Sequence, residues 1–301
     1  MLDCLVIGGG PAGLTAAIYL ARFHLSVAVV DAGHSRAGLI PLSRNHAGFP
    51  EGISGADLLA RMRAQARLYA ATFHDRRVET LERAAEGFFA SAGSMDFAAR
   101  SVLIATGVVN RRPAMLSDAV HDEALANGSW RYCPICDGYE VTDKRVAVIG
   151  TGERGCNEAL FLRSYTAHIT LVAPQSGHEL CEAQYALLRE AGVRVAGSCR
   201  AIALEGKAIC LDVNGDRLTF DGVYPALGSD IKSELAGMVG AAMSTEGCLT
   251  VDAHQRTNVP SLYAAGDVVL GLDQISHAMG EGGVAATTIR NDLARQTPLR
   301  R

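Results

Sequence analysis

The chain has 301 residues, with 28 Lys and Arg against 32 Asp and Glu, a net charge of −4 and a pI near 6.1. This slightly negative net charge argues against general electrostatic binding to nucleic acid or to an anionic membrane, because both require a basic face. The length allows about two domains. With 49% hydrophobic and 20% charged residues, the composition is typical of a folded chain and excludes a disordered one.

The N-terminus and the cysteine content bear on the compartment. Residues 1–8 include an acid and no basic segment, so they indicate a strand and not an export signal. No stretch approaches the roughly 18 consecutive apolar residues of a membrane span. Eight cysteines in a chain of this length are too sparse for a disulfide scaffold. We therefore expect a cytoplasmic protein without a membrane anchor.

Two segments of the chain share one order: a short apolar run, a glycine loop, a helical pattern and a second apolar run. This order is typical of buried parallel strands alternating with helices in a doubly wound sheet. The expected strands are 4–7, 27–30, 145–149 and 168–172, and the two helices are expected to end near residues 24 and 165. The sequence therefore predicts an α/β protein with two Rossmann-like (βαβ) domains.

The first glycine loop has the spacing of a dinucleotide site. Gly8, Gly10 and Gly13 follow a strand and open a helix, and Asp31 ends the next strand. In this pattern the first glycine allows the tight turn, the second admits the pyrophosphate and the third lets the helix pack on the strand. The helix amides then face the anion, and the acid accepts from ribose hydroxyls. An ordinary tight turn with an unrelated acid is the alternative.

Further along the chain, Cys133 and Cys136 form its one Cys-x-x-Cys motif, and Asp137 follows directly. Such a motif commonly lowers the pKa of one thiol and holds a partner close enough for a disulfide. An adjacent acid could carry the proton of each exchange step. The remaining cysteines supply no second close pair, so a four-ligand zinc site is disfavoured, and no metal is expected. Two buried structural cysteines are the other alternative.

The second glycine loop is less complete than the first. Gly150, Gly152 and Gly155 repeat the spacing after a clean strand. The following strand ends at Val172, and residues 173–177 offer neither an acid for ribose hydroxyls nor an Arg pair for a 2′-phosphate. A pyrophosphate site remains plausible here, and a retained fold with a weakened or lost site is the alternative.

With these motifs the chain resembles the low-molecular-weight thioredoxin reductases, which are flavoproteins of two Rossmann-like domains. The match extends over nearly the whole chain. Its most specific part is the cysteine pair just before the second glycine loop, because the larger disulfide reductases carry the pair near the first FAD loop. The matching segments are 8–13, 45–50, 105–107, 133–138, 150–155 and 257–267.

The resemblance implies roles for individual residues. FAD would bind the first loop, with Asp31 at its adenosine ribose and Asp267 near the ribityl chain and pyrophosphate. Cys136 would face the flavin, Cys133 would exchange with substrate, and Asp137 would serve as acid and base. The other cofactor-binding residues expected are Gly8, Gly10, Pro11, Ala12, Gly13, Asn45, Ala105, Thr106, Gly107, Gly266, Gln274 and Ile275, with Gly150, Gly152 and Gly155 for a pyridine nucleotide.

The resemblance also implies a homodimer and a discontinuous FAD domain, residues 1–112 and 246–301, around a central domain, residues 113–245, that carries the pair. Two family motifs are absent. The His-Arg-Arg that binds the NADPH 2′-phosphate falls at Val-Ala-Pro, residues 172–174, and the Arg-Gln-Ala near the C-terminus falls at Asp-Gln-Ile, residues 273–275. The choice between NADPH and NADH therefore stays open.

These observations favour an FAD-dependent thiol/disulfide oxidoreductase that moves electrons between NADPH or NADH and a disulfide substrate, either thioredoxin or a smaller molecule. A dithiol oxidase that passes electrons from flavin to dioxygen without a nucleotide is the alternative, and the missing Arg pair suits it. A flavin-binding sensor without turnover is disfavoured, because a sensor needs no proton carrier beside its cysteines.

Overall fold

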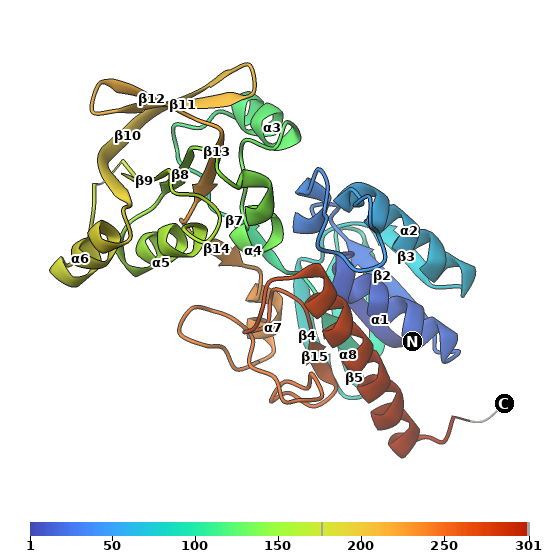
Figure 1. The fold of residues 1–301 in the computed structure, drawn as a ribbon. Coiled ribbons are helices and arrows are strands. Elements are labelled where there is room, and N and C mark those ends of the chain that lie inside the picture. The colour runs from blue at the N-terminus through green and yellow to red at the C-terminus, as the bar shows by residue number, and fades with distance from the viewer. Residues whose placement is uncertain (176, 300–301) are drawn as a thin grey trace.

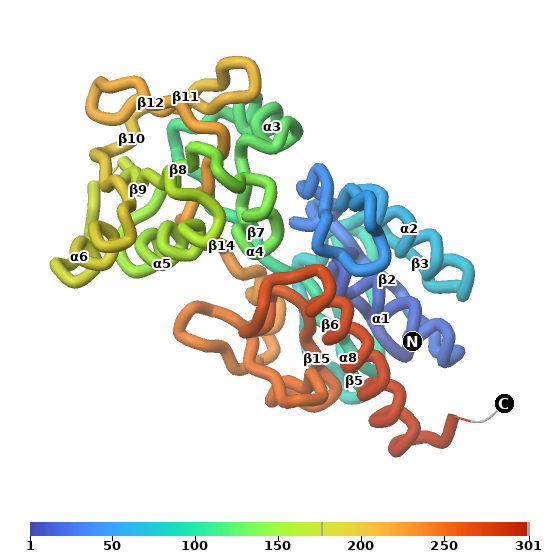
Figure 2. The backbone as a smooth tube through the Cα atoms, in the orientation of Figure 1, coloured from blue at the N-terminus to red at the C-terminus, as the bar shows by residue number. Residues whose placement is uncertain are grey.

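The computed structural model describes residues 1–175 and 177–299 and has two lobes, each built on a largely parallel sheet with helices against it (Figure 1). Figure 2 shows the N-terminal and C-terminal parts of the chain side by side in the first lobe, while the middle of the chain forms the second lobe. The predicted α/β class with two Rossmann-like units is confirmed. None of the described helices combines the length and apolar character that a bilayer crossing requires.

The sheet of the first lobe has both faces covered. Its strands are β1 (Leu2–Ile7), β2 (Val27–Asp31), β3 (Thr72–Asp75), β4 (Thr80–Ala84), β5 (Gly87–Ala92), β6 (Met95–Ile104) and β15 (Leu262–Ala264). Their order is β3-β2-β1-β6-β5-β4, and β15 also pairs with β6. β1 pairs in parallel with both β2 and β6. Because β1 lies at the centre of the sheet, it is apolar and buried from Cys4 onward.

Helices pack against this sheet and position the first glycine loop. They are α1 (Pro11–Arg22), the short 3₁₀ helix η1 (Arg36–Leu39), α2 (Gly55–Leu68), α7 (Glu234–Met238) and α8 (Ile275–Gln296). Helices α1 and α8 lie in direct contact, and a Cβ on Gly282 would come within 2.3 Å of the Ala12 carbonyl oxygen. Small residues at this crossing therefore bring the start of α8 close to the loop before α1.

The second lobe repeats the arrangement. Its strands are β8 (Val146–Ile149), β9 (Ile169–Ala173), β10 (Arg194–Glu205), β11 (Ala208–Val213), β12 (Asp216–Phe220) and β13 (Gly222–Pro225), in the order β12-β11-β10-β9-β8-β13. Its helices are α3 (Asp118–Ala126), α4 (Pro134–Asp137), the 3₁₀ helix η2 (Gly138–Val141), α5 (Gly152–Leu162) and α6 (Glu182–Glu190).

The predicted strands lie within β1, β2, β8 and β9 to within one or two residues, but both predicted helices end earlier than expected. Helix α1 ends at Arg22 because His24 adopts a left-handed φ of 62°, which breaks the helical hydrogen-bond pattern. Helix α5 ends at Leu162 in a turn that continues through Tyr165. Neither end carries a glycine or a proline, so the sequence held no strong stop signal.

A two-stranded antiparallel ladder joins the lobes, formed by β7 (Val108–Asn110) and β14 (Ser229–Ile231). Beyond β14, Ala236 and Ala241 are buried in the same hydrophobic cluster as Leu249 and the first sheet. We therefore propose that the chain passes between domains at β7 and β14. The expected change of domain between residues 245 and 246 stays a prediction, and this packing favours an earlier position.

Two helical glycines should respond in opposite ways to alanine. A Cβ on Gly13 would lie 2.0 Å from the Gly8 carbonyl oxygen, whereas a Cβ on exposed Gly280 would meet nothing within 4 Å. We expect Gly13→Ala to lower the free energy of unfolding by about 1–3 kcal/mol through overpacking, and Gly280→Ala to raise it by about 0.5–1 kcal/mol. Urea unfolding of both variants measures this, and equal effects would contradict the packing described.

Candidate active site

The first glycine loop forms a concave stretch of backbone, called the cradle here, whose space side chains at the glycine positions would fill. Gly8 has a φ of +110°, and a Cβ there would lie 2.2 Å from the Ala105 carbonyl oxygen at the end of β6. Helix α1 begins directly after Gly10, which caps it without a side-chain hydrogen bond. Its first amides are thus available to an anion. The Asp31 carboxylate lies against this loop, since a Cβ on Gly9 would come within 2.4 Å of it.

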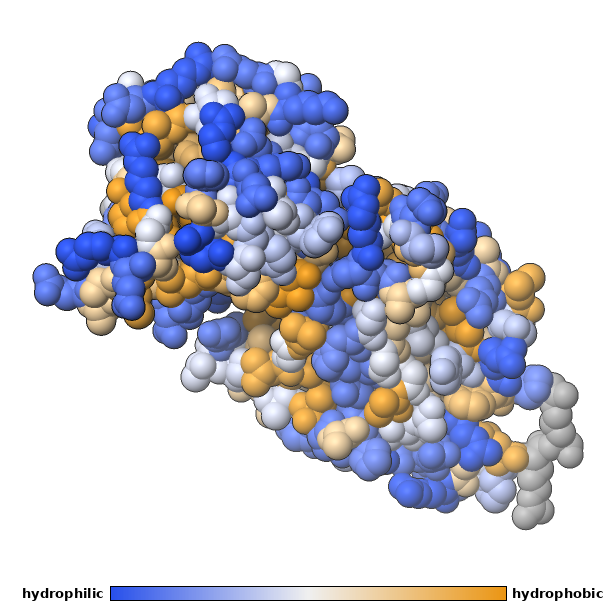
Figure 3. Space-filling view, viewed as in Figure 1, coloured by the Kyte–Doolittle hydropathy of each residue, from blue (hydrophilic) through white to orange (hydrophobic). Residues whose placement is uncertain are grey.

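A cavity of about 1650 Å³ extends from this cradle to the junction of the lobes. Figure 3 shows apolar surface gathered where the lobes meet. Both lobes line the cavity, and the predicted site residues that do so are Gly8, Gly10, Pro11, Ala12, Asp31, Asn45, Ala105, Thr106, Gly107, Cys133, Cys136, Asp137, Gly266, Asp267, Gln274 and Ile275. Gly13, Gly150, Gly152 and Gly155 lie outside it. An acid for ribose, free helix amides and this length of cavity fit FAD.

The cysteine pair lies on the second lobe and faces the first. Cys133 and Cys136 form a disulfide with their Cα atoms 5.2 Å apart, at the start of α4. The backbone N–H of Cys136 donates to the Cys133 Sγ over 3.1 Å. From the first lobe, Gln274 Nε2 donates to the Sγ of Cys133 (3.3 Å) and of Cys136 (3.2 Å). The residue that caps α8 therefore touches both sulfur atoms.

Asp137, the expected acid and base, is held by two partners. Arg131 Nη1 donates to its Oδ2 and the hydroxyl of fully buried Tyr224 donates to its Oδ1, each over 2.8 Å. Burial raises the pKa of Asp137 above its ordinary value, although the Arg131 cation and the Tyr224 hydrogen bond act to lower it. A raised carboxyl pKa suits proton transfer, and the role of Asp137 stays a prediction.

An ion-pair network near the first glycine loop was missed by the sequence analysis. Arg36 on η1 donates through Nη1 to Asp267 (3.1 Å) and to Asp273 (2.7 Å). Burial and the neighbouring Asp273 raise the pKa of Asp267. Asp273 is the position where the resemblance implies an arginine, and in this structure Asp273 pairs with Arg36. Residues 36 and 273 are too far apart in the chain for any local pattern to link them.

A second missed cluster lies directly before the cysteine pair. The ring of buried His121 lies 2.8 Å from Asp122 Oδ1 through Nδ1 and 2.8 Å from the Tyr132 hydroxyl through Nε2. Tyr132 lines the cavity and precedes Cys133. The three groups form a continuous hydrogen-bonded path from exposed Asp122 to the cavity wall. His121 reaches Tyr132 because of the way α3 packs in the second lobe. The spacing of these residues in the sequence does not indicate that contact.

The second glycine loop lies where it was predicted, between β8 and α5. The backbone around Glu179 contacts this loop. The backbone N–H of Glu179 donates to Thr151 Oγ1. The Glu179 carbonyl oxygen would be 3.8 Å from a Cβ on Gly152. His178 holds this segment to β10, its Nε2 lying 2.7 Å from the Ala196 carbonyl oxygen. The start of α5 is thus contacted by a backbone segment of the same lobe.

Fold and site together combine two Rossmann-like lobes with a cavity that is lined by the first glycine loop and by a disulfide, as in an oxidoreductase. The chain belongs to the pyridine nucleotide-disulphide oxidoreductase family, whose model matches residues 2–282. The predicted resemblance to thioredoxin reductases is confirmed, as is the class of FAD-dependent disulfide oxidoreductase.

Three known proteins illustrate this similarity. Thioredoxin reductase of Streptomyces coelicolor is 30% identical, over 89% of this chain and 86% of that protein. The crystal structure of HlmI has a TM-score of 0.90 at 26% identity and covers 98% of this chain and 93% of HlmI. The atypical thioredoxin reductase TRi of Desulfovibrio vulgaris Hildenborough is 30% identical, covers 99% of this chain and 100% of TRi, and has a TM-score of 0.56.

The raised pKa of Asp137 predicts a pH-dependent contribution to stability. A carboxyl whose pKa is higher in the folded state stabilises the fold below its unfolded pKa and loses that contribution as the pH rises through its folded pKa. The stability of the wild type relative to Asp137→Asn should therefore fall as the pH rises above the ordinary carboxyl pKa of 3.8 and through the higher folded pKa. Urea unfolding at a series of pH values measures this difference.

The matched control is Asp96→Asn, which removes an acid at an exposed position. A difference between wild type and Asp137→Asn that stays constant or grows with pH would show that the Asp137 pKa is not raised.

Proposed function

We propose that this chain reduces a disulfide substrate through the Cys133–Cys136 pair, with NADPH or NADH as the electron donor and FAD between them. The observation that carries the proposal is that one cavity is lined both by the first glycine loop and by the Cys133–Cys136 disulfide. When bound, FAD would supply the two-electron chemistry between nucleotide and disulfide.

Residues of the first lobe would hold the cofactor. The first glycine loop, with Gly13 packed beneath it, would face the pyrophosphate. Asp31 would accept from the adenosine ribose, and Asp267 would lie near the ribityl chain. Ala105, Thr106 and Gly107 at the end of β6, Gly266, and the residues Asn45, Gln274 and Ile275 would complete the pocket wall. All of these except Gly13 line the cavity, which supports the assignment.

The exchange itself needs only the cysteines and a proton carrier. The Cys133 thiolate would attack a substrate sulfur, forming a mixed disulfide and releasing one substrate thiolate. The Cys136 thiolate would then attack the Cys133 Sγ, releasing the second substrate thiolate and re-forming the Cys133–Cys136 bond. Asp137 would supply the proton that a leaving thiolate takes up.

Exposed side chains beside the cysteine pair support a protein-sized disulfide such as thioredoxin as substrate, and a smaller disulfide also fits. Ile135 is 51% exposed and Tyr139 is 80% exposed on either side of Cys136. Comparison of two relatives supports movement of the lobes during turnover. TRi matches the whole chain at 30% identity but superposes far less well than HlmI, as expected if the lobes of TRi are arranged differently.

The assembly and compartment are also proposals. Tyr19, Phe23 and Val284 are exposed apolar residues on the adjoining helices α1 and α8, which supports a homodimer built on this face. Equilibrium sedimentation of the holoprotein would test it. Several unpaired cysteines, among them exposed Cys181, fit a reducing cytoplasm.

A dithiol oxidase is the second candidate, and the segment around Glu179 favours it. This segment hydrogen bonds to Thr151 at the start of α5, where a nucleotide pyrophosphate would bind. Strand β9 ends at Ala173 and is followed by Pro174, with no arginine for a 2′-phosphate. In this case a substrate dithiol would reduce the Cys133–Cys136 pair, and dioxygen would accept the electrons.

Anaerobic absorbance titration of the holoprotein decides between the two candidates. If the chain is a disulfide reductase, NADPH or NADH bleaches the flavin rapidly, and a disulfide substrate restores its colour. If neither nucleotide bleaches it while a dithiol does, and air restores the colour, the chain is an oxidase. Flavin that responds to neither class of reductant contradicts both.

Serine variants test the roles of the two cysteines. If Cys136 faces the flavin, Cys133→Ser should show a long-wavelength absorbance band from the Cys136 thiolate beside oxidised flavin, and Cys136→Ser should lack it. Both variants should bind FAD and lose substrate turnover, because one thiol cannot complete the exchange. Cys181→Ser at an exposed position is the control. Full turnover in Cys136→Ser would contradict the assignment.

A further inference from the structure

The cysteine pair has one side-chain hydrogen-bond donor among the described residues, and that donor comes from the other lobe. Gln274 Nε2 lies 3.3 Å from the Cys133 Sγ and 3.2 Å from the Cys136 Sγ. An amide NH₂ group has two hydrogens, so it can serve both sulfur atoms together. The second donor to the pair is the backbone N–H of Cys136, which serves Cys133 alone.

A chain of hydrogen bonds continues from this amide into the first lobe. Ser43 Oγ donates to Asn45 Oδ1, and Asn45 Nδ2 donates to Gln274 Oε1, each over 3.1 Å. If the Gln274 amide alone were flipped, its Nε2 would face the Asn45 Nδ2 donor, and its Oε1 would face the lone pairs of the two sulfur atoms. Neither contact would be a hydrogen bond. With Asn45 as its donor, Gln274 Oε1 is occupied and the N–H groups of Gln274 face the disulfide.

The position of Gln274 adds a second reason for its contact with sulfur. Gln274 is the N-cap of α8, a helix of 22 residues, with no side-chain hydrogen bond to the helix amides. Its side chain is thus free to extend toward the second lobe. Since charge develops on sulfur whenever the disulfide opens, a donor held there in advance stabilises the reduced pair more than the neutral disulfide.

We propose that Gln274 is a catalytic residue that stabilises the thiolate formed when the Cys133–Cys136 bond breaks. In the exchange step an incoming thiolate attacks the Cys133 Sγ and forms a new S–S bond. The Cys133–Cys136 bond breaks, and its electron pair passes to the Cys136 Sγ. Gln274 Nε2 donates a hydrogen bond to that sulfur and makes it a better leaving group.

This inference rests on the proposed role of the pair as the redox couple. Charged groups also surround the site: Asp137 with Arg131, Glu140 with Arg44, Asp273 with Arg36, and the imidazole of His46 beside Ser276. Of the described charged side chains, none hydrogen bonds to either sulfur. A change in thiol acidity on altering Gln274 alone can therefore be traced to the amide.

The test compares Gln274→Met with wild type in the holoprotein. Methionine keeps the length of the side chain and removes the donor. We expect the pKa of the more acidic thiol of the reduced pair to rise by about one unit, the size of a lost hydrogen bond to a charged group. The rate of alkylation by iodoacetamide against pH, followed on the peptide that contains Cys133 and Cys136, measures this pKa.

A second readout is the equilibrium of the pair with reduced and oxidised glutathione. Gln274→Met should shift it about tenfold toward the disulfide at a pH above the thiol pKa. Gln274→Glu, which puts an acceptor in place of the donor, should shift both measurements in the same direction and further. Gln296→Met makes the same substitution at an exposed position at the end of α8 and should change neither.

The outcomes separate this proposal from the proposed function. If the wild-type pair exchanges with glutathione and the Gln274 variants match it in thiol pKa and equilibrium, the role of Gln274 is wrong and the redox couple stands. If the variants lose FAD affinity alone, Gln274 serves only the cofactor, which also overturns the proposal. A wild-type pair that does not exchange with glutathione contradicts both.

Discussion

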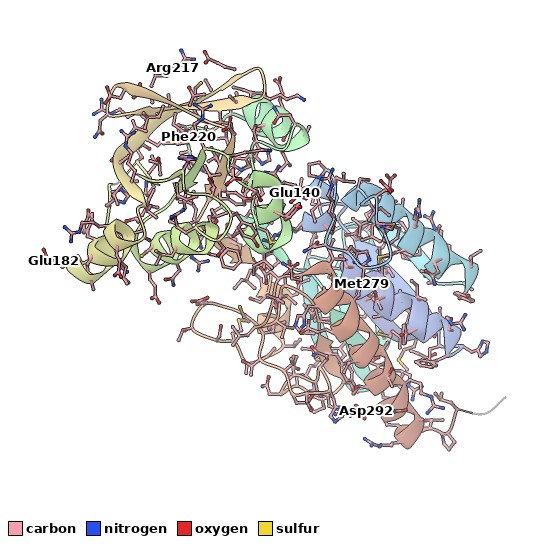
Figure 4. The ribbon with its side chains drawn as sticks, viewed as in Figure 1. Glu140, Glu182, Arg217, Phe220, Met279 and Asp292 are labelled. Carbon is pink, nitrogen blue, oxygen red and sulfur yellow. A yellow bond between two sulfur atoms is a disulfide. The ribbon has the colours of Figure 1, made fainter. Side chains whose placement is uncertain are left out.

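The contact between Gln274 and the Cys133–Cys136 disulfide is the interaction on which the rest of the site depends. It joins the start of α8 on the first lobe to the start of α4 on the second, and its three residues line the cavity. The first glycine loop lines the same cavity. Figure 4 shows Glu140 on the side of the second lobe that faces the first, where it forms an ion pair with Arg44. A ligand of the first loop that is long enough to reach the junction therefore meets the sulfur atoms.

Around this junction, the partly buried carboxylates of Asp137 and Asp267 and the more exposed Asp273 each have a partner. Arg36 lies between Asp267 and Asp273, while Arg131 and Tyr224 hold Asp137. Without these partners, burial of two or three carboxylates in one cavity wall would be costly. Asp273 receives its positive partner, Arg36, from a distant segment of the chain.

Much of the fold could be predicted from the sequence because its signals are local. The strand–glycine loop–helix order at residues 4–13 and again at 145–155 lies within short windows, and the Cys-x-x-Cys motif is adjacent to its acid. Contacts between segments distant in the chain could not be predicted. Arg36 with Asp273, His121 with Tyr132, and Gln274 with the disulfide depend on how the lobes and α3 pack. The segment around Glu179 follows a strand without a motif, so nothing in the sequence indicated that it lies against Thr151.

The central claim is that the cavity binds FAD beside the Cys133–Cys136 pair. Equilibrium dialysis of the purified protein against FAD, read by flavin absorbance, tests it most directly. The account predicts saturation at one FAD per chain. Protein that folds yet remains colourless and takes up no FAD would contradict it.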